Sequence, residues 1–160
     1  MNIFGIGTDI VECARIARML EKHGEVFLRR VFTAEEIAYC RPRKRFIEHF
    51  AGRWAAKEAV FKSLGTGWAK GMCWTDIAIT HDPRGQPHVQ VRGAVEEYMR
   101  ACHISTILVS ISHCRRYATA CAIALLDAAV QLPASSAIAL PGGIEQQAGA
   151  AHSSPISRTE

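Results

Sequence analysis

The sequence predicts an α+β fold, in which helices and strands occupy separate parts of the chain. Residues 13–64 carry mostly helical spacing of apolar side chains, whereas β-branched segments with partial alternation dominate residues 74–126. One apolar strand precedes the helices, and the two kinds of segment do not alternate as they would in an α/β protein. The length of 160 residues suits a single domain with a real core.

The composition is that of an ordinary globular protein, with 49% hydrophobic and 21% charged residues. The net charge of +4 suits an acidic partner or a phosphate-bearing ligand, but it is too small to indicate nucleic acid by itself. No apolar run reaches the roughly 18 residues of a membrane span, and the N-terminus lacks the basic region of a signal peptide. Six cysteines without zinc spacing predict free thiols in a reducing cytoplasm.

The first half of the chain predicts one strand followed by helices. Residues 3–12, IFGIGTDIVE, predict a short buried strand that breaks at its glycines. Residues 13–24 have helical periodicity and end at Gly24, a usual helix stop. Thr33 and Glu36 have the spacing of a capping box, which makes this pair structural. A basic stretch, RPRKRF, then leads into a long helix that ends in the glycines of FAGRWAAKEAVFKSLGTG.

The second half of the chain predicts mainly strands. Partly alternating β-branched segments occupy residues 74–82, 88–92 and 105–113. The turn residues PRGQP between the first two predict a hairpin, and residues 93–102 predict a short helix. Residues 117–126, YATACAIALL, predict a final strand, although their alanines leave a helix open.

The folded domain is predicted to cover residues 1–127. Residues 128–160 are rich in Ala, Ser, Pro and Gly and have few charges. This composition predicts a disordered or loosely attached tail.

Charges interrupt the apolar face of the long helix. Glu58 and Lys62 are spaced as an exposed i,i+4 pair, which would be worth only about 0.2–0.5 kcal/mol. Lys57, however, projects within the apolar stripe and needs a partner, because burying a lone ammonium group is costly. The basic side chains of this region outnumber its acids, Glu48 and Glu58; they are Arg43, Lys44, Arg45, Arg53, Lys57 and Lys62. A glycine-flanked turn follows, and such turns offer backbone N–H groups to phosphate. The alternative to a solvated pair is therefore a site for a metal-bound polyphosphate.

Two further residues have alternative interpretations. Asp9, at the end of the first strand, is either the N-cap of the next helix or an oxygen ligand that shares Mg²⁺ with Glu58. Mn²⁺ accepts the same ligands, so the metal is left open. His113 closes a β-branched strand and is either structural or a ligand contact that titrates near neutral pH.

Several segments together resemble the holo-acyl carrier protein synthase family, the compact 4'-phosphopantetheinyl transferases. They are GIGTDIVE, FTAEE, FAGRWAAKEAVFKSLGTG, DIAI, GQP and SISH, in family order across roughly residues 3–125. The resemblance implies a phosphopantetheinyl transferase domain at residues 1–127, with a small antiparallel sheet packed on a long central helix. It also implies a homotrimer with active sites between subunits. The implied activity transfers the phosphopantetheine arm of coenzyme A to a serine of apo acyl carrier protein, releases 3',5'-ADP and supports fatty-acid biosynthesis.

The resemblance also implies roles for individual residues. Asp9 and Glu58 match the Mg²⁺ ligands, and Lys62 matches the basic residue that faces the phosphates. Positions around the nucleotide and pyrophosphate are matched by Arg45, Arg53, the turn Gly65, Thr66 and Gly67, the Gly85–Pro87 loop with Pro87, and His113. The group that accepts the serine proton is either Glu58 or a metal-bound water linked to Asp9.

A basic stripe runs along the first helix. Arg15, Arg18 and Lys22 are spaced i, i+3, i+7 and share one face. The spacing alone favours a solvated face. Because carrier proteins of this family's reactions are acidic, the resemblance makes a docking surface an equal alternative, with Arg15 as its strongest match. Glu25 stands where a further cation would extend the stripe, so docking is expected to be tuned differently.

Two other classes of function compete with the transferase. The first is a non-catalytic module that binds coenzyme A, a nucleotide or nucleic acid. Paired carboxylates and the lack of a row of aromatic side chains argue against nucleic acid, because carboxylates repel phosphates unless a metal intervenes. The second is a Mg²⁺-dependent nucleotide hydrolase, which would share the site and use water as its nucleophile.

Overall fold

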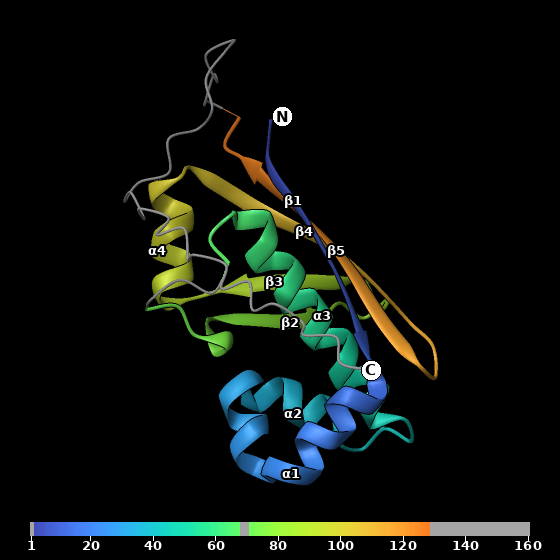
Figure 1. The fold of residues 1–160 in the computed structure, drawn as a ribbon. Helices are drawn as coiled ribbons and strands as arrows, with labels where there is room; N and C mark the ends of the chain where they lie inside the picture. The colour runs from blue at the N-terminus through green and yellow to red at the C-terminus, as the bar shows by residue number, and fades with distance from the viewer. Residues whose placement is uncertain (1, 68–70, 129–160) are drawn as a thin grey trace, which may run out of the picture.

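The computed structural model describes residues 2–67 and 71–128, which form an α+β fold (Figure 1). The elements are β1 (Ile3–Glu12), α1 (Cys13–Val31), α2 (Ala34–Cys40), α3 (Phe46–Leu64), a 3-10 turn η1 (Trp74–Asp76), β2 (Ile77–His81), β3 (Pro87–Val91), α4 (Gly93–Ala101), β4 (Ile104–His113) and β5 (Tyr117–Leu126). The predicted class is thereby confirmed. The predicted tail lies, apart from residue 128, outside the described residues. Among the described helices, none has both the length and the apolar character to cross a membrane.

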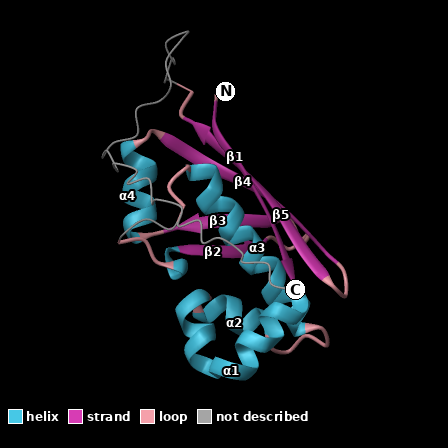
Figure 2. Ribbon diagram, in the orientation of Figure 1, coloured by secondary structure: helices cyan, strands magenta, loops and turns pink. Residues whose placement is uncertain are grey.

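Two antiparallel sheets enclose the long helix α3. The larger has the strand order β1-β5-β4, and the smaller is the hairpin of β2 and β3 (Figure 2). The predicted hairpin is confirmed, with Gly85 at a φ of 89° in its turn. The Asp82 carboxylate accepts the backbone N–H groups of Arg84 and Gln86, as turn aspartates commonly do.

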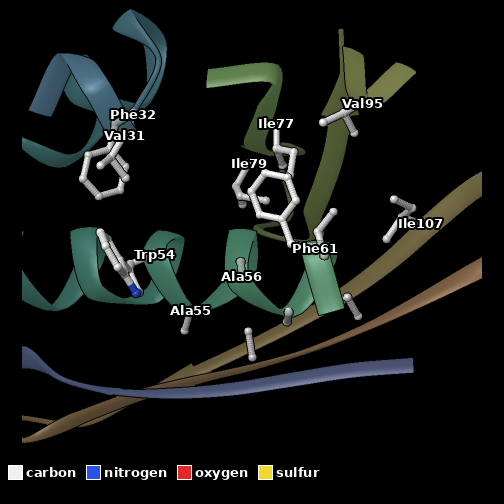
Figure 3. Close-up of a cluster of buried hydrophobic side chains, with 14 of the residues drawn as sticks. Val31, Phe32, Trp54, Ala55, Ala56, Phe61, Ile77, Ile79, Val95 and Ile107 are labelled. Carbon is white, nitrogen blue, oxygen red and sulfur yellow. The ribbon is translucent and has the colours of Figure 1, made fainter. Parts of the chain in front are cut away.

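Helix α3 presents different side-chain sizes to its two neighbours. Small residues such as Ala55 point toward the three-stranded sheet, whereas Phe61 reaches the hairpin residues Ile77 and Ile79 (Figure 3). Near the other end, the rings of Trp54 and η1 residue Trp74 lie 4.6 Å apart. The helix is therefore buried on both sides, which is why its sequence has no clean amphipathic pattern.

The alanines of the last strand pack against this helix. Four of them alternate along β5 and are buried: Ala118, Ala120, Ala122 and Ala124. Their period of two is that of a strand with one inward face, so the helical alternative for residues 117–126 is wrong. Small side chains on both surfaces allow α3 and the sheet to approach closely.

Strand β1 differs from its prediction in two ways. It does not break at its glycines, because Gly5 and Gly7 are the points where α3 touches it. A Cβ added at Gly7 would lie 2.0 Å from the backbone oxygen of Ala59, so a side chain has no room there. The strand is also not buried on both faces, since Ile6 and Ile10 are 59% and 67% exposed.

Helix α1 extends beyond its predicted end. Gly24 does interrupt the helical backbone, with φ 51° and ψ −132°, but a second helical segment continues to Val31. That segment packs Phe27 and Leu28 into the core, and their burial outweighs the local stop signal. The prediction of a helix that ends at Gly24 is correct only for the first segment.

A buried ion pair explains Lys57. The predicted capping box forms, with Glu36 accepting the Thr33 backbone N–H at 2.8 Å. The same carboxylate lies 2.7 Å from Lys57 Nζ and accepts the backbone N–H of Ile79 at 3.0 Å. Lys57 also donates to the carbonyl oxygens of Val31 and Trp74. Lys57 therefore joins α3 to α1, α2 and η1, and its inclusion among the phosphate-facing cations is wrong.

Candidate functional site

Close packing of β1 on α3 brings three charged side chains together. Lys62 Nζ lies 2.8 Å from Asp9 Oδ1 and donates to the Thr8 carbonyl oxygen at 3.0 Å. Glu58 stands one helical turn before Lys62 on α3. Among the described ion pairs, Lys62 binds Asp9 and none joins it to Glu58, so the interpretation as an i,i+4 pair is wrong.

The N-cap interpretation of Asp9 is also wrong. Asp9 lies inside β1, and the N-cap of α1 is Glu12, whose side chain makes no capping hydrogen bond. Asp9 is half-buried on the strand face that meets α3, next to the exposed Ile10. Its carboxylate is thus held between the sheet and the helix.

The electrostatics of this group suit a cation. Burial, and then the negative charge of Asp9, raise the pKa of Glu58, while Lys62 and Arg15 partly oppose this rise. A divalent cation between the two carboxylates would relieve their repulsion, and carboxylate oxygens are the ligands that Mg²⁺ prefers. Within the described residues no cluster of three or more metal-ligating side chains occurs. Asp9 and Glu58 therefore fit a magnesium ion that takes its other ligands from substrate and water.

The C-terminus of α3 forms the predicted glycine turn. Gly65 has a φ of 73° and caps the helix by donating its N–H to the Lys62 carbonyl oxygen at 3.1 Å. Thr66 Oγ1 bonds to the Gly67 carbonyl oxygen at 2.9 Å. From α4, Tyr98 donates to the carbonyl oxygen of Leu64 at 3.2 Å. The turn is thus anchored close to Lys62, although the Gly65 N–H is already used.

A second group of predicted residues lies at the N-terminus of α3. His113 Nδ1, at the end of β4, is 3.4 Å from Glu48 Oε2, and Arg45 Nη1 is 3.8 Å from the same oxygen. The ring of His49 contacts that of His113 with centroids 5.4 Å apart. Glu48 therefore organises Arg45 and His113, a role that the sequence did not indicate.

Arg53 belongs to this second group but is buried. Its guanidinium carbon lies 4.2 Å from the Tyr39 ring centroid, and its Nη2 lies 3.2 Å from His81 Nδ1. Pro87 opposes His81 in the hairpin register. Tyr39 and His81 gave no functional signal in the sequence, because each comes from a different element and no motif joins them.

One protomer does not bring the two groups together. Glu48 and Glu58 are ten positions apart on one helix, which corresponds to about 15 Å at 1.5 Å per residue. Asp9, Glu58 and Lys62 form one group, and Arg45 and His113 belong to the other. The two groups can therefore bind the same ligand only if that ligand is long, or if a second copy of the chain supplies one of the groups.

The basic stripe of α1 is exposed and borders an apolar cavity. Arg15, Arg18 and Lys22 are exposed, and the Arg15 guanidinium lies 5.8 Å from the Trp54 ring centroid. The cavity has a volume of about 430 Å³, and its lining includes Met19, His23, Val26, Phe27, Trp54 and Trp74. The sequence did not reveal it, because the kink at Gly24 is what turns the second half of α1 toward the tryptophans.

Comparison with known proteins shows which family the chain matches. The model of the 4'-phosphopantetheinyl transferase superfamily matches residues 5–122. The chain is 46% identical over 119 residues to the holo-[acyl-carrier-protein] synthase of Protochlamydia amoebophila, covering 74% of this chain and 95% of that protein. The crystal structure of the Neisseria meningitidis synthase matches with a TM-score of 0.72 at 34% identity, covering 77% of this chain and 98% of that one.

A ligand-bound structure is also similar. The holo-(acyl-carrier-protein) synthase of Bacillus anthracis, described in complex with CoA (3',5'-ADP), matches with a TM-score of 0.65 at 35% identity. The match covers 78% of this chain and 98% of that one.

Proposed function

The chain belongs to the 4'-phosphopantetheinyl transferase superfamily, and from that premise we propose that it is a holo-[acyl-carrier-protein] synthase. It transfers the 4'-phosphopantetheine of coenzyme A to a serine of apo acyl carrier protein and releases 3',5'-ADP. The single observation that carries this function is the group formed by Asp9, Glu58 and Lys62 across β1 and α3.

Positive charge held at this site would counter the negative charge of the pyrophosphate. Asp9 and Glu58 would hold Mg²⁺, which supplies charge neutralisation at the pyrophosphate. Lys62, fixed by Asp9 and the Thr8 carbonyl oxygen, adds a positive charge beside the same group. Such fixed charges account for most of the catalysis in phosphoryl transfer.

The serine proton goes to Glu58 in this proposal. The serine oxygen forms a bond to the β-phosphorus as the bond from that phosphorus to the oxygen of 3',5'-ADP breaks, and the hydroxyl proton moves to a base. Glu58 is the candidate base because its half-buried carboxylate stands beside Asp9 and Lys62, where the serine hydroxyl would have to approach the phosphorus. A water held by Asp9 is the alternative base.

The nucleotide occupies the second group of residues. The proposed contacts are Arg45, Arg53, Pro87 and His113 of this group, together with the turn Gly65, Thr66 and Gly67 beside Lys62 at the other end of α3. Because Glu48 and Glu58 are about 15 Å apart along α3, we place the Arg45 and His113 group of one protomer beside the carboxylates of the next. The site would then lie between subunits of a homotrimer.

One face of the three-stranded sheet, which no element within residues 2–67 and 71–128 covers, supports this assembly. Ile6, Ile123 and Leu108 form one row across the strands by register. Leu108 is 52% exposed, and Ile10 adds apolar surface to the same face. An exposed apolar sheet face of this kind indicates a protein contact.

The carrier protein docks on α1. The stripe of Arg15, Arg18 and Lys22 would attract an acidic carrier, and the neighbouring cavity with the 74%-exposed Val26 would accept an apolar side chain of it. Arg15 also lies close enough to Glu58 to affect its pKa. The stripe therefore leads the carrier serine toward the carboxylates.

The setting follows from the chemistry. Holo carrier protein serves fatty-acid biosynthesis, and the proposal places the enzyme in the cytoplasm, which the six free thiols support. Coenzyme A and the carrier are the partners, and neither nucleic acid nor a membrane is required. A hydrolase would use the same carboxylates, but the basic stripe and cavity favour a protein acceptor.

Intact-mass spectrometry tests the function directly. The protein is mixed with coenzyme A, Mg²⁺ and apo acyl carrier protein, with Glu58→Gln as the matched variant. We expect a phosphopantetheine mass gain on the carrier that is lost in the variant and in chelator. Coenzyme A binding without any mass gain would favour the binding module, and release of 3',5'-ADP without carrier modification would favour the hydrolase.

A further inference from the structure

A buried guanidinium in the N-terminal half of α3 lacks an acidic partner. Arg53 is only 3% exposed, and among the described residues it forms no ion pair. Its Nη1 donates to the His49 carbonyl oxygen at 3.5 Å, and its Nε has no hydrogen-bond partner. A buried charge with only weak neutral acceptors is costly. The guanidinium of Arg53 is therefore suited to bind an anionic ligand.

An aromatic ring and an imidazole hold the guanidinium in place. The rings of Tyr39 and His81 are stacked at 5.1 Å with an interplanar angle of 3°. The guanidinium carbons of Arg43 and Arg53 lie 3.9 Å and 4.2 Å from the Tyr39 centroid. The ring face of Tyr39 attracts both cations, and His81 adds a hydrogen bond to one of them.

The hydrogen bond fixes the protonation state of His81. Arginine can only donate, so Nδ1 of His81 must accept from Arg53 Nη2, and the ring must be neutral with its proton on Nε2. An imidazolium carries N–H groups on both nitrogens. Protonation would therefore remove this hydrogen bond and place a second positive charge beside Arg53.

The surroundings keep His81 neutral near pH 7. Burial, and then the charges of Arg53 and Arg43, lower the pKa of His81, and Asp82 only partly opposes this. The charged and titratable groups around the cluster are Arg53 and His49 from α3, Tyr39 and Cys40 from α2, Arg43 from the next loop, and Asp82 and His88 from the hairpin. An anion would stabilise the imidazolium and reverse this balance.

We propose that Tyr39 and His81 form a latch that holds Arg53 while His81 is neutral, and that protonation of His81 frees Arg53 for the phosphate groups of coenzyme A. His81 is thus a positioning residue that acts through Arg53. This inference rests on the proposed function, because coenzyme A is the anion that it names. Coenzyme A binding and protonation of His81 then favour each other.

The latch is tested by calorimetric measurement of coenzyme A binding to wild type and to the variant His81→Gln. A glutamine oxygen can accept from Arg53 but does not titrate. The dissociation constants of wild type and variant are compared from about pH 8 to about pH 5.5, a range that spans histidine titration. Because both proteins bind the same ligand, titration of the phosphates of coenzyme A does not affect the ratio of the two dissociation constants. We expect a ratio near unity at the alkaline end and, in acid, binding by the variant about five-fold or more weaker.

Two controls separate the latch from other effects. His23→Gln, at an exposed position on α1 that is not among the groups acting on His81, should keep the wild-type pH profile. In wild type and Arg53→Gln, NMR titration of the His81 ring without coenzyme A should show a higher pKa once the guanidinium is removed. A constant ratio at all pH values, or an unchanged His81 titration, would overturn the latch. Absence of coenzyme A binding by wild type at every pH would instead overturn the proposed function.

Discussion

At the scale of single residues, charge on α3 has two separate purposes. Lys57 and Lys62 are five positions apart. Lys57 is fully buried and pairs with Glu36, whereas Lys62 is half-exposed and pairs with Asp9. Burial lowers the pKa of Lys57, while the Glu36 charge and hydrogen bond oppose this shift. The first lysine holds elements together, and the second belongs to the proposed site.

Replacement of Lys57 by methionine should destabilise the fold. The change leaves the Glu36 carboxylate buried without its cation, which typically costs about 3–5 kcal/mol. Urea unfolding measures this loss, and the double variant with Glu36→Gln should lose less than the sum of the two single variants. Lys44→Met, at an exposed position, is the control. A loss below about 1 kcal/mol would show that the pair does not stabilise the fold.

Reversal of Arg15 to glutamate should weaken carrier docking. We expect the carrier KM to rise about ten-fold, equivalent to roughly 1.4 kcal/mol, and more than the KM for coenzyme A. The effect should shrink at high salt because exposed charges are screened. Steady-state kinetics with each substrate varied measures both values. Arg29→Glu, an exposed reversal outside the stripe, is the control, and an unchanged carrier KM would contradict docking on this face.

At the scale of elements, the glycines of β1 position the site. Gly5 and Gly7 bring the strand against the backbone of α3, and Asp9 follows two residues later. The distance between Asp9 and Lys62 therefore depends on residues that carry no side chain. This contact gives two glycines in a strand a physical purpose.

Substitution of Gly7 by alanine should impair stability and activity together. The new methyl group would meet the backbone oxygen of Ala59 at 2.0 Å, so the strand must move away from α3. We expect a loss of about 1–3 kcal/mol in unfolding free energy, and about a hundred-fold in kcat from displacement of Asp9. Denaturation and transfer assays measure these losses. In Gly52→Ala the nearest atom is a side-chain methyl of Ile111 at 3.1 Å, which can shift, so near-normal values are expected.

At the scale of the whole molecule, the elements that the structure describes leave one face of the three-stranded sheet uncovered. Helix α3 covers the inner face of the three-stranded sheet, and the opposite face exposes Ile6, Ile10 and Leu108. The two groups of site residues lie at opposite ends of α3. Association through the bare face would explain both features at once.

Replacement of Ile10 by aspartate should separate the subunits. Because Ile10 is exposed in the protomer, the change should leave the fold intact while a buried carboxylate disfavours the interface. Light scattering after gel filtration should give a trimer for wild type and a monomer for the variant. Val26→Asp, an exposed apolar position on α1, should remain trimeric. A monomeric wild type with full activity would contradict a shared site.

Mixing of two inactive variants tests whether subunits share the site. Glu58→Gln removes one group and His113→Ala impairs the other, so each homotrimer should have low activity. After mixed refolding, some sites combine an intact Glu58 with an intact His113 from a neighbour, and activity should rise above both parents. No recovery, in the presence of mixed trimers detected by mass spectrometry, would place both groups in one protomer's site.

The sequence by itself determined the α+β class, the hairpin and the capping box, because these depend on local patterns, and an ordered set of motifs was enough to propose the residues of the site. It misplaced the end of α1 and the burial of β1, since packing of Phe27 and the close approach at Gly7 override local signals. Only the tertiary structure decided that Lys57 binds Glu36, that Lys62 binds Asp9, and that Arg53 contacts both Tyr39 and His81. The physical reason is that a charged side chain pairs with whichever opposite charge the fold brings within a few ångströms. In the pairs of Lys57 and Lys62, that partner lies 21 or more positions away in the chain.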